Sequence, residues 1–191
     1  PNMNGYHTYY YAWHDKMDEA LTLQEDSIQI SISGKVQSVS KVYQLSRSEF
    51  NLIKGTSDAT FVIEVANIKT IIDREFPNIN DRKENVYGQL VTVSYEALLT
   101  EKAVQKTGRP GFENDVRLEF SNNPKQSGAG ETGFTPWDTV VCFTYRLNGL
   151  KINNYANPLK GAQFKLFSDE KCERELFVKK ILGLIFWLSS S

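Results

Sequence analysis

The sequence has few cysteines, few histidines and almost no excess charge. Its 22 lysines and arginines nearly balance its 23 aspartates and glutamates, which gives a formal net charge of -1. The basic residues are scattered and no run of them exceeds two, which argues against nucleic acid as a partner. Cys142 and Cys172 make neither a disulfide framework nor the cysteine spacing of a zinc site. His7 and His14 lie on opposite strand phases and form a poor metal pair, so we expect no metal and no cofactor.

Long hydrophobic runs are also absent. The apolar tail ILGLIFWL (181–188) is far shorter than the roughly 20 residues that a membrane-spanning helix needs, so we expect no membrane span. The tail is compatible with two interpretations: a core strand, or a terminus that lies outside the fold. With 40% apolar and 12% aromatic residues, the chain nevertheless has enough apolar side chains to bury a core.

Alternation of apolar and polar residues is the main pattern that is present. It is typical of half-buried strands, and it predicts strands over 8–15, 27–36, 59–68, 89–99 and 113–120. Apolar residues at helical spacing predict one short helix over 68–76. The segment 125–136 is rich in Gly, Ser and Thr, and the strand pattern resumes at 138. We therefore expect a β-sandwich domain over 1–124, a linker over 125–137 and the incomplete start of a second domain over 138–191.

Several segments in order resemble a known family. GYHTYYYAWHDKMDEALTL (5–23), VTVSYEALLTEKAV (91–104) and ENDVRLEFSNNP (113–124) are similar to successive motifs of fimbrial isopeptide-forming domains. The segment 138–167 resembles the first hairpin of a Cna B-type domain. Together they resemble a sortase-assembled pilin of Gram-positive bacteria, most closely a backbone subunit.

This resemblance implies an all-β fold: an Ig-like or Cna B-type β-sandwich with one short helix, followed by the first hairpin of a second sandwich. It implies an extracellular structural protein on the bacterial cell wall. The partners it implies are other pilin subunits, sortase during assembly, and host surface ligands. Any catalysis in such a protein is a single turnover on itself, so we do not expect an enzyme.

In the resembled family, a lysine on the first strand is joined to an asparagine on the last strand by a spontaneous amide bond, assisted by a buried carboxyl group. Such a lysine has to be neutral and such a carboxyl group protonated, and burial favours both states. Side-chain parity then selects residues that should face the core. It selects Asp15 as the assisting acid, Asn122 as the acceptor and Lys151 as the donor of the second domain. Glu64 is the alternative acid. Asn114 has the right parity too, but it begins its strand instead of ending it.

The family's lysine strand lies before the segment that begins at Gly5, so we expect no completed isopeptide bond within this chain. The competing reading is a surface adhesin or a carbohydrate- or host-protein-binding module. Its aromatic platform would be made by Tyr6, Tyr10 and His14, if these face solvent. A glycoside hydrolase has little support, because no pair of acidic residues can be placed across a cleft.

Overall fold

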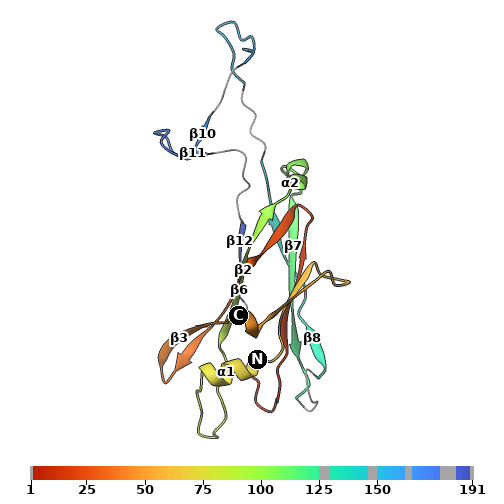
Figure 1. Ribbon diagram of the computed structural model, residues 1–191, viewed down its shortest axis with the longest axis vertical. Coiled ribbons are helices and arrows are strands. Elements are labelled where there is room, and N and C mark those ends of the chain that lie inside the picture. The colour runs from red at the N-terminus through yellow and green to blue at the C-terminus, as the bar shows by residue number, and fades with distance from the viewer. Residues whose placement is uncertain (1, 125–129, 146–149, 162–164, 177–183, 190–191) are drawn as a thin grey trace.

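The protein is an all-β sandwich, as predicted. The computed structural model describes residues 2–124, 130–145, 150–161, 165–176 and 184–189. Most of the secondary-structure elements in these residues are strands (Figure 1). Sheet A contains, in spatial order, β4 (Asn51–Lys54), β5 (Phe61–Val65), β1 (Tyr11–Met17) and β7 (Phe112–Ser121), and β7 pairs in turn with β8 (Thr132–Phe134) and β9 (Asp138–Cys142). Sheet B contains β12 (Leu184–Ser189), β6 (Leu90–Leu99), β2 (Leu21–Val36) and β3 (Val39–Gln44).

The core lies between the two sheets and is built by the alternation that the sequence shows. Successive residues of a strand face opposite sides of its sheet, so every second residue is buried. The predicted inward residues are indeed buried on both sheets: Tyr9, Tyr11 and Trp13; Ile28, Ile30 and Ile32; Phe61, Ile63 and Val65; Val91, Val93 and Tyr95. This pattern fixes the strand register, because a shift by one residue would expose the apolar set.

The predicted helix is present as α1 (Ile68–Glu75). Its apolar stripe is buried, and the side chain of Asn67 caps its first turn by accepting a hydrogen bond from the Thr70 N–H. Two shorter helical elements were not predicted: α2 (Glu101–Gln105) and the 3₁₀ turn η1 (Arg47–Glu49). Within the described residues, no helix has both the length and the apolar character that crossing a membrane requires.

Three segments expected to lie beyond the first domain pair with its sheets. β8, which lies in the predicted linker, pairs antiparallel with β7 from Glu119 to Ser121. β9, assigned to the start of a second domain, pairs antiparallel with β7 from Phe112 to Val116. β12 lies in the apolar tail, for which the sequence allows either a core strand or a terminus outside the fold. It pairs antiparallel with β6. The expected second hairpin is only partly described, because 146–149 and 162–164 lie outside the described residues. What is described there is one bridge, Ile152 to Pro158, and the short pair β10 (Leu166–Phe167) with β11 (Glu175–Leu176).

Candidate functional site

A carboxyl group lies in the centre of the core. Asp15 follows the aromatic residues of β1 on the same face, and only 1% of it is exposed. In the pairing of β1 with β7, Asp15 is opposite Val116 and Met17 is opposite Asn114. Asn114 is therefore the diagonal neighbour of Asp15 on the core face, within reach of a polar side chain. It is 2% exposed.

Tyr95 completes the cluster from the opposite sheet. Its hydroxyl group donates a hydrogen bond of 2.5 Å to Asp15 Oδ2 and accepts one of 3.0 Å from Asn114 Nδ2. The same Asn114 amide donates to Asp15 Oδ2 at 3.1 Å. The ring of Phe61 meets the Tyr95 ring edge-on, with 5.5 Å between centroids. Asp15, Tyr95 and Asn114 thus form one buried polar cluster, which we call the core triad.

Burial sets the protonation of the triad. It raises the pKa of Asp15 from 3.8 to about 6, although the hydrogen bonds from Tyr95 and Asn114 oppose this rise. Burial, together with the neighbouring Asp15 carboxyl group, also raises the pKa of Tyr95. Asp15 is thus a carboxyl group that gains and loses its proton much closer to neutral pH than an exposed aspartate does.

The core triad is incomplete as a hydrogen-bonded network. Asp15 Oδ1 and Asn114 Oδ1 are both buried, and neither has a partner among the described residues. A buried acceptor without a donor destabilises a fold by about 1–3 kcal/mol. The buried polar residues of the described chain are His14, Asp15, Asn114 and Ser121, so they include no lysine. As far as the described residues go, the triad therefore has two acceptors without a donor and no cation.

The predicted orientation of Asp15 is confirmed, but that of Asn122 is wrong. Asn122 lies one residue beyond β7 and is exposed. The alternation of buried and exposed residues in β7 ends before Asn122. Leu118 and Phe120 are only half-buried, and the next buried residue is Ser121, which has the other parity. Ser121 Oγ accepts a hydrogen bond from the Tyr10 N–H at 2.8 Å, which holds the strand end in this phase.

Lys151 was expected to face inward, and this prediction is also wrong, because Lys151 is exposed. Lys151 lies beyond β9, in a part of the chain where residues of both parities are exposed, among them Leu150, Ile152 and Tyr155. Within β9, buried Cys142 pairs with buried Phe112. Residues of the other parity in and after β9, such as Val141 and Tyr145, are exposed.

The alternative acid, Glu64, is not near the triad. It pairs in register with Ala12, and paired residues project from the same face of a sheet, so it lies on the outer face of sheet A. There it accepts a hydrogen bond from Asn51 Nδ2 at 2.9 Å. Of the predicted site residues, the structure brings only Asp15 into the core triad.

Asn114 and Tyr95 are the members that sequence reasoning missed. Parity predicts that both face inward, but the place of Asn114 at the start of its strand argues against an acceptor role there. Tyr95 was read only as a core residue. The signal that could have found them was polarity: a phenol and an amide on otherwise apolar core faces need a polar partner.

The three residues of the aromatic platform expected for the adhesin hypothesis are buried or half-buried. His14 is buried and lies 2.7 Å from Glu119 through its Nε2. Tyr6 and Tyr10 are half-buried, each packed against a hydrophobic cluster. A ligand surface therefore has to be sought elsewhere on the molecule.

Comparison of the sequence with protein-family models and with curated proteins finds no match in either case.

Proposed function

We propose that this chain is a structural β-sandwich domain of a bacterial surface pilus, and that its core triad is the acid and acceptor half of a lysine–asparagine crosslink. The observation that carries the proposal is the contact between a buried carboxyl group and a buried amide, each with an unpaired oxygen atom. The order of the sequence motifs supports the pilus context. Asn114 takes the acceptor role in place of Asn122.

The roles follow from the surroundings of each group. A lysine ammonium entering the triad would donate hydrogen bonds to Asp15 Oδ1 and Asn114 Oδ1, and burial would favour its deprotonation. Asp15, with its pKa raised to about 6, can carry a proton to the Asn114 amide and polarise it. The neutral amine then attacks Cγ of Asn114. The C–N bond to Nδ2 breaks, ammonia leaves with the transferred protons, and a secondary amide remains.

The amine has to come from outside the described residues in their present arrangement. Every described lysine is exposed or half-buried, and several are engaged in surface ion pairs. We expect the mass of the purified chain, measured intact under denaturing and reducing conditions, to equal the sequence mass, which would mean that Lys125, Lys179 and Lys180, outside the described residues, do not close the bond either. Loss of one ammonia would identify a closed bond and refute this expectation.

Supplying the amine tests the chemistry itself. Met17 is buried, faces the core and pairs directly with Asn114, and its unbranched side chain has nearly the length of lysine. The variant Met17→Lys should lose the mass of one ammonia as it folds, and peptide mapping should find residue 17 joined to Asn114. The crosslink should be absent when Asn114→Ala is added, and strongly slowed by Asp15→Ala.

A second lysine position keeps the test possible if the Met17→Lys variant does not fold. Val116 is buried opposite Asp15 and lies two residues along the strand from Asn114, so Val116→Lys offers the amine from β7. Met17→Leu, which adds no amine, controls for repacking. If both lysine variants fold, as judged by urea denaturation, and both keep the full sequence mass, the triad is not a crosslinking site.

The pilus context has its own test. Gold-labelled antibodies against the chain, applied to the bacterium that carries it, should decorate surface fibres at regular intervals along their length. Labelling confined to the cell body, with no fibre marked, would contradict a shaft role without bearing on the chemistry of the triad.

A further inference from the structure

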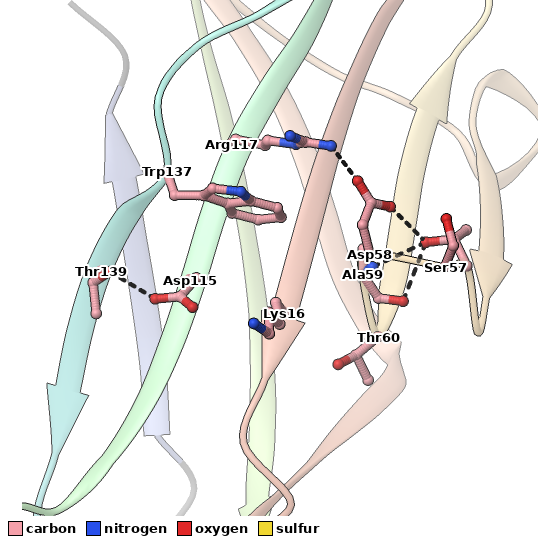
Figure 2. Close-up of a pocket in the computed structure, with 10 residues that line it drawn as sticks. Lys16, Ser57, Asp58, Ala59, Thr60, Asp115, Arg117, Trp137 and Thr139 are labelled. Carbon is pink, nitrogen blue, oxygen red and sulfur yellow. Dashed lines mark hydrogen bonds and ion pairs between the residues drawn. The ribbon is translucent and has the colours of Figure 1, made fainter.

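A second feature lies on the outer face of sheet A, away from the core triad. A hollow of about 510 Å³ opens between the β4–β5 turn, Thr56 to Thr60, and the start of β9 (Figure 2). Its floor is formed by Lys16 of β1 and Asp115 of β7. These two residues are direct partners in the strand register, so their side chains project from the same face.

Arg117 ties the two walls of the hollow together. It forms an ion pair with Asp58 of the turn. Its guanidinium carbon also lies 4.5 Å from the centre of the Trp137 ring and 4.1 Å from that of Phe134. Such stacking contributes about 0.5–2 kcal/mol when the cation is partly desolvated. The indole is thus held in place before any ligand arrives.

Hydrogen bonds fix the remaining parts of the rim. Thr139 Oγ1 donates to Asp115 Oδ1 at 2.6 Å, which orients that carboxylate. Within the turn, Thr56 Oγ1 accepts from the Ala59 N–H at 3.1 Å and lies 3.2 Å from the Ala59 carbonyl oxygen. A preformed rim lowers the entropy that a ligand loses on binding.

Three groups remain available to a ligand. Trp137 is 36% exposed, and Figure 2 shows Arg117 on one side of its indole and the Lys16–Asp115 floor on the other. Lys16 is exposed and has no ion-pair partner among the described residues. Asp115 uses one carboxylate oxygen for Thr139, so the second can accept a hydrogen bond. An aromatic face, an ammonium donor and a carboxylate acceptor therefore converge on one space.

We propose that this hollow binds a single pyranose sugar at the end of a glycan. The C–H face of a pyranose packs on an aromatic face, and each of its hydroxyl groups both donates and accepts hydrogen bonds. Neighbouring hydroxyl groups would accept from Lys16 and donate to Asp115. The lining contains two cations, Lys16 and Arg117, and two anions, Asp58 and Asp115. Because these charges balance, the hollow favours neither an anionic ligand such as a phosphate nor a cationic ligand such as a polyamine. The hollow is large enough for one sugar ring and too small for a protein interface.

Binding can be tested directly on the chain. The probes are methyl pyranosides of glucose, galactose and mannose and methyl N-acetylglucosaminide, titrated while tryptophan fluorescence and amide NMR shifts are recorded. We expect at least one of these sugars to bind, and to shift the resonances of Lys16, Asp115 and the Trp137 indole. Removing the stacking face in Trp137→Ala should weaken binding by roughly tenfold or more.

Two further variants keep the test decisive if Trp137→Ala unfolds. Lys16→Ala changes only an exposed side chain, so it should fold and still weaken binding. Tyr155→Ala removes a strongly exposed aromatic outside the hollow and should bind like the wild type. Absence of binding to all four sugars, or equal binding by Lys16→Ala and the wild type, would overturn the proposal. This outcome is independent of the crosslinking test, because the triad lies on the other face of the sheet.

Discussion

Replacing Asp15 by asparagine removes the titrating group of the core triad while keeping its shape. Burial raises the pKa of Asp15 from 3.8 to about 6 in the folded chain. The sign of its effect follows from linkage. The stability contributed by this group is complete below pH 3.8, where the carboxyl group is protonated in both states. It is lost as the pH rises through 6, because the folded state must then bury a charge or hold a proton that the unfolded state has released.

The size of the effect follows from the same pKa values. One pH unit corresponds to about 1.4 kcal/mol, so a difference of about two units gives about 3 kcal/mol. Asp15→Asn does not titrate, so its free energy of unfolding relative to the wild type should improve by about 3 kcal/mol between pH 2 and pH 7 and by about 2.4 kcal/mol between pH 4 and pH 7. Urea denaturation at four pH values, followed by the fluorescence of buried Trp13, measures this difference.

A neighbouring aspartate provides the control of opposite sign. Burial alone raises the pKa of Asp18, but hydrogen bonds from Lys106 and from the Ala20 N–H lower it below its ordinary value. Asp18 therefore stabilises the fold at neutral pH, and this contribution is lost in acid. The free energy of unfolding of Asp18→Asn should therefore fall relative to that of the wild type as the pH rises, whereas that of Asp15→Asn should increase. If the two variants change in the same direction, or if Asp15→Asn shows no pH dependence, the assignment of a raised pKa to Asp15 is refuted.

Two further substitutions test the packing around the site. Tyr95→Phe removes the hydroxyl group that bridges Asp15 and Asn114, and should destabilise the fold by about 1–3 kcal/mol. Carboxyl ¹³C titration should show a higher pKa for Asp15, and an unchanged pKa would contradict the bridge. Gly111→Ala would place a Cβ atom 2.5 Å from the Cys142 carbonyl oxygen at a φ of +85°. Its loss of melting temperature should exceed that of Gly55→Ala, which has a φ of +67° and no atom within 4 Å; equal losses would exclude the clash.

The sequence predicts those parts of the fold in which one face of an element is buried. β5, β6 and α1 show regular alternation or helical spacing, and each lies close to its predicted bounds. β2 ends at the predicted Val36 but begins at Leu21, well before the predicted start at 27. β3 shows no such pattern: Val39 and Val42 are each 69% exposed, so no face of it has to be apolar. Its formation depends on pairing with β2, a contact that no local pattern encodes.

The same reasoning explains which site residues could be predicted. Parity places Asp15 correctly because β1 is an inner strand of sheet A, between β5 and β7, and every residue on its core face from Tyr11 to Met17 is buried. Parity fails for Asn122 because the residue lies past the end of β7, where the alternation no longer holds and Ser121, of the other parity, is the buried residue. The contact of Asp15 with Tyr95 joins positions 80 residues apart on different sheets. Only the packing of the two sheets against each other creates it.

The pairing of β1 with β7 gives one sheet two chemically different faces. Asp15 and Asn114 point into the core, while the next residues, Lys16 and Asp115, form the floor of the outer hollow. A core with two unpaired buried oxygen atoms is less stable than an apolar one, so stability alone does not explain the triad. A crosslink at Asn114 would join β7 covalently to the strand that brings the lysine, and would compensate for that loss. It would also fix the strand that carries Asp115, so that the outer hollow would keep its geometry under tension.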